Sequence, residues 1–285
     1  HFKVSRAFES WEDMAKASRK EYDAVVVGSD QLWLPSNIMA DYYTLNWVPQ
    51  DVKKIAYATS FGIGSIPAKY EKIYSHYLKR IDYLSARETS GQDIIKKLAG
   101  RDVQLVNDPA LLLDADGWNE VISNEPLIKE KYVFCYFMGN NPEQRVFVRR
   151  LANKKGLKVV ALLHLDQYIA TDEYYVDMAP WHVSPADFVN LVKNAECVCT
   201  DSFHGTVFSI IYSRPFFTFK RFNKKASLST NTRIISLLTR LGLMDRLVLD
   251  MDCEQTFDID WNKIQSGVSQ FRKASSEYLL NAIRA

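Results

Sequence analysis

The sequence alternates short apolar runs with longer segments of helical periodicity, and this alternation limits its fold more than any other feature. The runs Ala24–Val27 and Ile55–Ala58 contain no charged residue. Continuous apolar runs of this kind are expected of strands in a sheet that helices cover on both faces. Turn residues, Gly28-Ser29-Asp30 and Thr59-Ser60-Phe61-Gly62, follow the two runs. We therefore predict an α/β fold with parallel sheets.

Two regions of the chain carry this pattern. A length of 285 residues fits two cores, because single hydrophobic cores stop growing at roughly 250–300 residues. Composition and periodicity both change between residues 107 and 131, and the strand pattern restarts at Tyr132. We predict an N-terminal domain over residues 1–125 and a C-terminal domain over 126–285, with the last helix crossing back onto the first domain.

Charge and hydropathy exclude several classes of protein. Lys and Arg total 36 against 34 acidic residues, a net charge of +2, which lacks the basic excess of a dedicated nucleic-acid binder. No apolar run reaches the ~18–20 residues of a membrane span, and the first residues form no signal-peptide core. We therefore expect a cytoplasmic protein that binds no nucleic acid. The four cysteines form no CxxC pair and are expected to be reduced core residues.

The most informative segment is Thr200–Thr206, which follows the predicted strand Glu196–Thr200 and begins a predicted helix. In open parallel sheets, ligands bind beyond the carboxyl ends of the strands, where helix N-termini present N–H groups. Backbone amides there could bind a phosphate or carboxylate that the imidazole of His204 also reaches, and Gly205 would let the backbone approach the ligand. The alternative is that Asp201 or Ser202 only caps the helix and that His204 has no functional role.

Two cations follow predicted strands in the same way. Lys220 comes directly after the strand ending at Phe219, and Arg87 after Tyr83–Ala86. Arginine binds carboxylate or phosphate in a bidentate manner. Each residue taken alone is more simply explained as solvated surface, and for Lys220 the neighbouring Lys224 and Lys225 favour a basic loop.

Motifs for other chemistries are missing. The residues around His76, His164 and His182 have no metal-ligand spacing, and the sequence has no phosphate-binding P-loop, nucleophile elbow or dinucleotide fingerprint. We assign no metal and no cofactor.

Five ordered pieces of the sequence carry a family resemblance. They are DAVVVGSDQLW (23–33), SFG (60–62), SARE (85–88), NDP (107–109) and TDSFHG (200–205), with PFFTFK following at 215–220. Over about residues 20–245 the chain resembles the polysaccharide pyruvyltransferases. Members of that family usually begin with a strand and a glycine-rich loop that are not visible here. We therefore expect the first domain to be incomplete at its N-terminus.

The resemblance implies a GT-B-like fold, in which two Rossmann-like domains face a cleft. It implies phosphoenolpyruvate as the donor substrate and a sugar of a cell-surface polysaccharide or its precursor as acceptor, either lipid-linked or nucleotide-linked, with peripheral association at the inner face of the membrane.

The resemblance favours functional roles for His204, Arg87 and Lys220, and the chemistry of pyruvyl transfer suggests the following assignments as a hypothesis. His204 would be the general acid and Asp30 would orient or deprotonate the acceptor hydroxyl. Arg87 and Lys220 would hold the donor. The remaining expected substrate-binding residues are Ser202, Phe203, Gly205, Ser60 and Asn107.

Two other functions stay open at this point. The same architecture hosts glycosyltransferases that use a nucleotide sugar, because fold alone does not fix function. A non-catalytic sugar-binding protein could also retain the fold. Neither alternative is separated from pyruvyl transfer by the residues alone.

Overall fold

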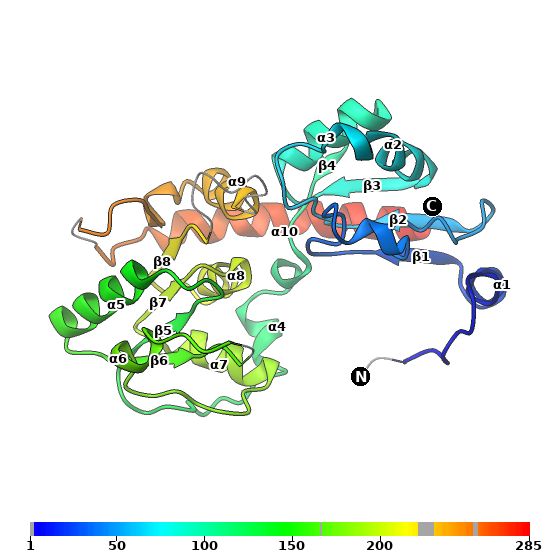
Figure 1. Ribbon diagram of the computed structural model, residues 1–285. Helices are drawn as coiled ribbons and strands as arrows, with labels where there is room; N and C mark the ends of the chain where they lie inside the picture. The colour runs from blue at the N-terminus through cyan, green and yellow to red at the C-terminus, as the bar shows by residue number, and fades with distance from the viewer. Residues whose placement is uncertain (1–2, 166, 222–230, 253–255) are drawn as a thin grey trace. The chain divides into compact units, whose positions relative to one another are not determined.

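The computed structural model describes residues 3–165, 167–221, 231–252 and 256–285 (Figure 1). The chain divides into two compact units. Unit 1 comprises the residues up to Pro109 together with Lys273–Ala285, and unit 2 comprises Ala110–Arg272. Each unit is built around its own parallel β-sheet, as predicted from the apolar runs.

The sheet of unit 1 has the order β1-β2-β3-β4, with every neighbouring pair parallel. Its strands are β1 (Ala24–Val27), β2 (Lys53–Ala56), β3 (Tyr83–Ala86) and β4 (Gln104–Leu105). The helices of this unit are α1 (Trp11–Glu21), α2 (Glu71–Arg80) and α3 (Thr89–Ala99), with the 3-10 turns η1 (Ile38–Ala40) and η2 (Ala68–Tyr70). The core contains the rings of Trp33, Phe61, Tyr74 and Tyr77, which pack at tilted angles with ring centroids 5.3–5.8 Å apart.

The sheet of unit 2 has the order β6-β5-β7-β8-β9, again parallel throughout. Its strands are β5 (Tyr132–Tyr136), β6 (Lys158–Leu162), β7 (Cys197–Thr200), β8 (Phe216–Phe219) and β9 (Leu247–Val248). The helices are α4 (Ala115–Asn119), α5 (Pro142–Lys155), α6 (Asp172–Tyr175), α7 (Pro185–Asn194), α8 (Phe203–Ile211), α9 (Thr232–Leu241) and α10 (Trp261–Arg284), with η3 (Pro109–Leu112) and η4 (Met244–Arg246).

Alternate residues of the unit 2 strands belong to different cores. Phe134, Val160 and Phe216 pack in one cluster, whereas Cys135, Val159 and Phe217 pack in another. Because successive side chains of a strand point to opposite faces, the sheet is buried on both sides. This explains why its strands appear in the sequence as continuous apolar runs.

Helix starts follow the expected capping chemistry. Asn141 caps α5, with Pro142 at the first helical position. At α7, the Ser184 hydroxyl accepts the N–H of Asp187 while the Asp187 carboxylate accepts the N–H of Ser184. Both helices begin where the sequence predicts them.

The division between the units falls after Pro109, whereas the sequence predicts a boundary near residue 125. The intervening polar segment is anchored to unit 2 by Leu111, Ile122 and Ile128, which are buried in its core. Spaced single apolar residues in a polar segment do not produce a periodic signal, so the sequence does not indicate which unit this segment packs against. At the other end, the last residues of α10, from Lys273 onward, belong to unit 1.

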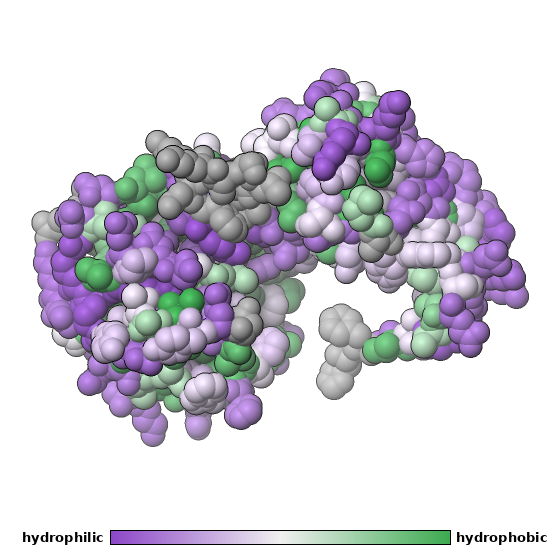
Figure 2. Space-filling view, in the orientation of Figure 1, coloured by the Kyte–Doolittle hydropathy of each residue, from purple (hydrophilic) through white to green (hydrophobic). Residues whose placement is uncertain are grey.

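The surface seen in Figure 2 is mainly hydrophilic, with hydrophobic residues in small patches. Among the helices that the structure describes, none is both long and apolar enough to cross a membrane. Cys135, Cys197 and Cys199 are buried free thiols of β5 and β7. Cys253 lies outside the described residues.

Candidate functional site

Strand order places a ligand-binding position at the carboxyl edge of the unit 2 sheet. On one side of β5 lies β6, and on the other lie β7, β8 and β9 in order. The strand order therefore reverses between β5 and β7, and such a reversal is where open α/β sheets bind ligands. The segments that leave the sheet there are Phe137–Asn141 and Asp201–Ser202. The second of these is the segment predicted from the sequence.

The turn after β7 is held by side-chain hydrogen bonds to the end of β5. The Thr200 hydroxyl donates to the carbonyl of Tyr136 (2.5 Å) and accepts the N–H of Ser202 (3.0 Å). Asp201, 1% exposed, accepts the N–H groups of Met138 (2.7 Å) and Gly139 (2.9 Å). Asp201 is therefore not the helix cap, because its carboxylate joins the ends of two strands.

Ser202 is the N-cap of α8, and its hydroxyl accepts the N–H of Gly205 at 3.4 Å. Gly205 itself is required by packing. A Cβ at this position would lie 2.6 Å from the Thr200 hydroxyl oxygen, so the helix can lie this close to the strand only with glycine there. The glycine therefore lets the helix pack closely against the strand. The sequence had suggested a different reason, namely that it lets the backbone approach a ligand.

His204 is the one residue of α8 that is not buried. Its imidazole lies edge-on to the ring of Phe203, with centroids 5.5 Å apart. Phe203 is 4% exposed in the unit 2 core, and the guanidinium of Arg233 lies 5.5 Å from its ring centroid. The helix therefore presents His204 at the sheet edge and uses Phe203 for packing; a substrate contact through Phe203 stays a prediction.

Lys220 leaves β8 at the same edge and is half-buried. Its carbonyl accepts a hydrogen bond from Gln144 (3.3 Å). The next residue, Arg221, donates to the carbonyl of Asp201 (3.4 Å), and its Nε lies 3.9 Å from the Asp201 carboxylate. Lys224 and Lys225 lie outside the described residues. The edge of unit 2 thus carries His204 at the start of α8, Arg221 against Asp201, and Lys220 at the end of the neighbouring strand β8.

In unit 1, Arg87 also follows its strand, but it is 6% exposed and lies between carboxylates. Its Nη1 pairs with Asp108, whose side chain is 2% exposed, and its Nη2 lies 3.0 Å from Asp30. Burial lowers the pKa of Arg87, but the charges of Asp108, Glu88 and Asp30 outweigh burial and raise it overall. The guanidinium is therefore held charged in ion pairs within its own unit.

Asp30 is the exposed member of this cluster. Its side chain is 53% exposed and its backbone is left-handed, with φ 65°. The carbonyl of Asp30 accepts the N–H of Ser60 (2.9 Å), and Trp33 donates its N–H to Ser60 (3.2 Å). The carboxylate is thereby presented at the strand end with one oxygen bound by Arg87.

Ser60 and Asn107 are more buried than a substrate-binding role suggests. Ser60 has no exposed surface, and its hydroxyl donates to Glu88 (2.8 Å) and accepts the N–H of Gly62 (3.0 Å). Asn107 is 6% exposed; its backbone bonds to Tyr57 and Ser275, and its Nδ2 has no hydrogen-bond partner among the described residues. Substrate contact through either side chain stays a prediction.

Sequence reasoning missed the carboxylates that organise both edges. The three carboxylates are almost fully buried, and each lies within three residues of the end of a strand: Glu88 after β3, Asp108 after β4 and Asp201 after β7. A signal was present, because an acidic residue close behind an apolar run needs a buried partner. Three His, Cys, Asp or Glu side chains placed to hold a metal are not found in the part of the chain that the structure describes.

Comparison with solved structures identifies the fold. S. aureus MnaA, solved with UDP, is 15% identical, covers 99% of this chain and 85% of its own, and has a TM-score of 0.52. A UDP-GlcNAc 2-epimerase from Neisseria meningitidis is 12% identical, with coverage of 98% and 84% and a TM-score of 0.48. The wall teichoic acid polymerase TagF is 15% identical, with coverage of 84% and 69% and a TM-score of 0.45. The match to MnaA supports the predicted GT-B-like α/β fold, and at this identity it shows the fold alone.

Comparison of sequences identifies the family. No curated protein matches the chain. The sequence profile named polysaccharide pyruvyl transferase matches residues 2–221, a range that contains both strand-end clusters, with Arg87 in one and His204 in the other. On this match, and with the fold and motifs in agreement, the chain belongs to the polysaccharide pyruvyl transferase family.

Proposed function

We propose that this protein transfers the pyruvyl group of phosphoenolpyruvate to two hydroxyls of a sugar, forming a cyclic pyruvate ketal and releasing phosphate. The observation that carries the proposal is the edge of unit 2, where α8 presents only His204 from a turn at the strand-order reversal. Membership of the family supports a transferase acting on a saccharide. We place the reaction in the cytoplasm. If the acceptor is lipid-linked, the reaction takes place at the inner face of the membrane; if it is nucleotide-linked, it takes place away from the membrane.

Donor binding is assigned to the α8 N-terminus and Lys220. The first N–H groups of a helix and its dipole favour an anion, and the ammonium group leaves the neighbouring strand at the same edge. Phosphoenolpyruvate carries a phosphate and a carboxylate, so it offers an anionic group to each. No metal or cofactor is assigned to the reaction.

His204 is proposed as the general acid. Its imidazolium gives a proton to the methylene carbon of phosphoenolpyruvate, which makes the central carbon an electrophile. One sugar hydroxyl oxygen bonds to that carbon, the bond to the phosphate oxygen then breaks, and the second hydroxyl closes the ketal. The two hydroxyls release two protons: one restores His204 and the other leaves with phosphate. Imidazole suits this cycle because it exchanges protons near neutral pH.

Asp30 is proposed to accept or orient the acceptor hydroxyl, and Arg87 is assigned first to holding Asp30. Two nitrogens of Arg87 pair with the carboxylates of Asp30 and Asp108, so its guanidinium positions the Asp30 side chain. A direct contact of Arg87 with the donor, together with His204 and Lys220, stays a prediction from the family resemblance.

The test is phosphate release from phosphoenolpyruvate over a panel of activated sugars. His204→Ala should lower turnover roughly 10²–10⁴-fold, the usual contribution of a positioned acid, with an unchanged melting temperature. His76→Ala is the matched control, because His76 is exposed on α2. Lys220→Ala should raise the KM for phosphoenolpyruvate about tenfold or more. Near-normal turnover of His204→Ala would remove it from the mechanism.

Thermal-shift titration separates this function from nucleotide-sugar transfer. A ligand that binds the folded state raises the melting temperature. Phosphoenolpyruvate should stabilise this protein with no nucleotide added, and a nucleoside diphosphate should stabilise it only where the acceptor is nucleotide-linked. Stabilisation by the diphosphate alone would favour a glycosyltransferase, and sugar binding without turnover of any donor would favour a non-catalytic protein.

A further inference from the structure

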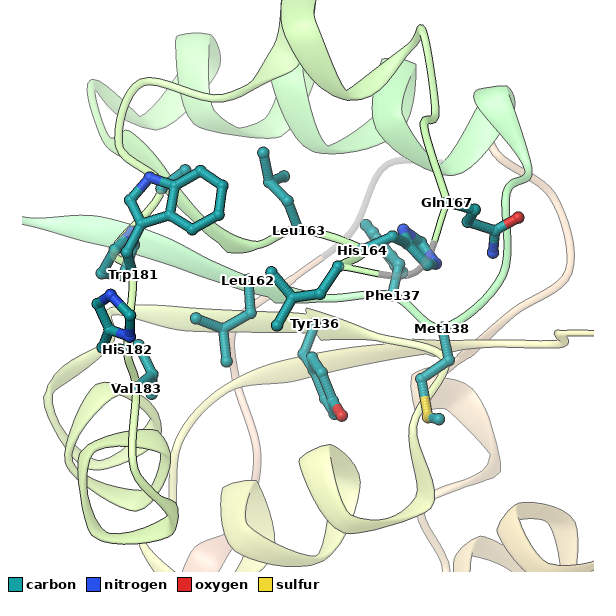
Figure 3. A pocket seen from close by; sticks show the side chains of 13 residues that line it. Tyr136, Phe137, Met138, Leu162, Leu163, His164, Gln167, Trp181, His182 and Val183 are labelled. Atoms are coloured by element: carbon teal, nitrogen blue, oxygen red, sulfur yellow. The ribbon is translucent and has the colours of Figure 1, made fainter.

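Unit 2 contains a pocket that the proposed reaction does not use. It has a volume of about 640 Å³, within the ~300–1,000 Å³ typical of ligand pockets. It lies at the carboxyl ends of β5 and β6, and its walls include Tyr136, Leu162, His164, Trp181, His182 and Val183. Figure 3 shows Trp181 and His182 on one side and His164 on the other, with Leu162 and Tyr136 between them.

The walls of the pocket are mainly apolar. None of its described lining residues is Lys, Arg, Asp or Glu. A phosphate-bearing ligand would need a cation or a helix N-terminus here, and the helix that follows, α7, has the acidic Asp187 in its first turn. The charge of the pocket therefore disfavours a nucleotide and favours a neutral ligand.

An exposed indole borders the pocket. Trp181 is 72% exposed, although aromatic side chains of this size are usually mostly buried. The next residue, His182, has the left-handed φ of 57°, a conformation that costs energy in a residue with a Cβ. A ring with one apolar face would cover the indole, and aromatic side chains bind such faces at little cost in conformational entropy.

A buried histidine in the wall adds a hydrogen-bonding requirement. The side chain of His164 is 9% exposed, and its Nδ1 lies 3.4 Å from the Asp172 carboxylate, which Arg145 holds at 2.9 Å. This pair favours the tautomer with the proton on Nδ1, leaving Nε2 an acceptor. Nε2 is buried and has no hydrogen-bond partner among the described residues. A hydroxyl donor would satisfy it, whereas a hydrocarbon chain would leave it unpaired.

The pocket adjoins the His204 turn through one strand. Met138 lines the pocket and donates its N–H to Asp201, which directly precedes the α8 cap. Because β5 lies between β6 and β7, and strands are about 4.8 Å apart, the ends of β6 and β7 are separated by roughly 10 Å.

We propose that this pocket binds a neutral pyranose ring of the acceptor, next to the sugar that receives the pyruvyl group. The ring stacks on Trp181, and one of its hydroxyls donates to Nε2 of His164. Only the choice of the acceptor as the source of this ring rests on the proposed function. The pocket thus gives the enzyme a preference for acceptors of at least two sugars.

Binding is tested with saturation-transfer NMR on the full chain, with methyl β-galactoside, methyl β-glucoside and methyl α-mannoside as probes, and with uridine and farnesol as the two other classes. A pyranoside should bind. Trp181→Ala and His164→Asn should each weaken it roughly two- to tenfold, the effect of one stacking or hydrogen-bonding contact. Trp11→Ala, which removes a half-exposed indole of α1, should bind as the wild type does.

A second substitution at His164 separates recognition from folding. In His164→Asn the amide can reach Asp172 but not the position of Nε2, whereas in His164→Gln it can reach the position of Nε2. Gln should therefore retain more affinity than Asn, with melting temperatures compared in parallel. Equal binding by the wild type and Trp181→Ala, or binding of uridine or farnesol alone, would overturn the proposal.

Failure of this inference and failure of the proposed function give different results. A protein that binds the pyranoside through Trp181 but releases no phosphate from phosphoenolpyruvate keeps the pocket and loses the reaction. A protein that transfers pyruvate with the same KM for mono- and disaccharide acceptors keeps the reaction and loses the pocket.

Discussion

At the scale of single residues, Arg87 shows how a structure changes the meaning of a motif. An arginine after a strand suggests an anion site, but here the guanidinium is surrounded by Asp108, Asp30 and Glu88. A buried charge without a partner is far less stable than a paired one. The first effect of removing Arg87 should therefore be on folding.

We predict that Arg87→Ala lowers the free energy of unfolding by about 3–5 kcal/mol, because it removes the charged partner that Arg87 gives to the buried carboxylate of Asp108. Urea denaturation measures this. Arg19→Ala is the matched control, since Arg19 and Asp51 form an exposed pair, and its midpoint should hardly move. An unchanged midpoint for Arg87→Ala, with donor binding lost, would instead restore the role that the family resemblance implies.

Sequence reasoning found the residues at the strand ends but not their partners. His204, Lys220, Arg87 and Asp30 all follow strands, because apolar runs and turn residues locate strand ends from local information. The pairing of Arg87 with Asp108 joins positions 21 residues apart and depends on β3 lying beside β4. Such pairings depend on which strands are neighbours in the sheet, and this order cannot be predicted from the residues around each strand.

At the scale of elements, helix α8 is held in place by its close packing against strand β7. Local signals were sufficient to place both elements, since the apolar run ends at Thr200 and Ser202 is a good cap. They were insufficient to explain Gly205, whose requirement comes from the side chain of Thr200 in three dimensions.

We predict that Gly205→Ala destabilises the protein by about 1–3 kcal/mol, because its methyl group would displace the Thr200 hydroxyl from its hydrogen bonds. Gly267→Ala, in the middle of α10, is the contrasting variant. Its nearest neighbour would be Leu241 at 3.9 Å, so it should stabilise by roughly 0.5–1 kcal/mol. Melting curves of the two variants should shift in opposite directions, and a shared direction would contradict the packing argument.

At the scale of the whole molecule, one helix contributes to both units. Residues of α10 up to Arg272 belong to unit 2, where Arg272 donates to the carbonyl of Leu111 (2.9 Å). In unit 1, Ser275 accepts the N–H of Asn107 (2.9 Å), and Tyr278 lies 6.4 Å from the ring of Tyr57. The sequence predicted this helix and its crossing back onto the first domain, but not the residue at which it passes from one unit to the other.

The pH dependence of unfolding should report on this end of α10. Burial raises the pKa of Tyr278 to about 12 and also raises the pKa of Tyr57. Tyrosine in the unfolded chain ionises near 10, so between pH 10 and 12 the unfolded state releases protons that the folded state retains. The contribution of these groups to stability is complete below pH 10 and is lost as pH rises through 12.

Urea unfolding between pH 8 and 11.5 measures this loss. The wild type should lose stability above pH 10 by up to about 1.4 kcal/mol per pH unit for each such tyrosine. Tyr278→Phe should lose stability less steeply over the same range, while Tyr22→Phe, an exposed tyrosine, should follow the wild type. Parallel curves for Tyr278→Phe and the wild type would show that Tyr278 ionises alike in both states.

The carboxylate of Asp201 links the ends of β5 and β7 by accepting hydrogen bonds from the N–H groups of Met138 and Gly139. The pocket wall at Met138 is thereby joined to the residue that precedes the helix carrying His204. An acceptor that occupies both the pocket and the position beside His204 must match the distance between them. Linkage geometry as well as sugar identity would then decide which repeating units this enzyme accepts. Changing that distance, by altering the turn after β5, is then a way to direct the enzyme toward other glycans.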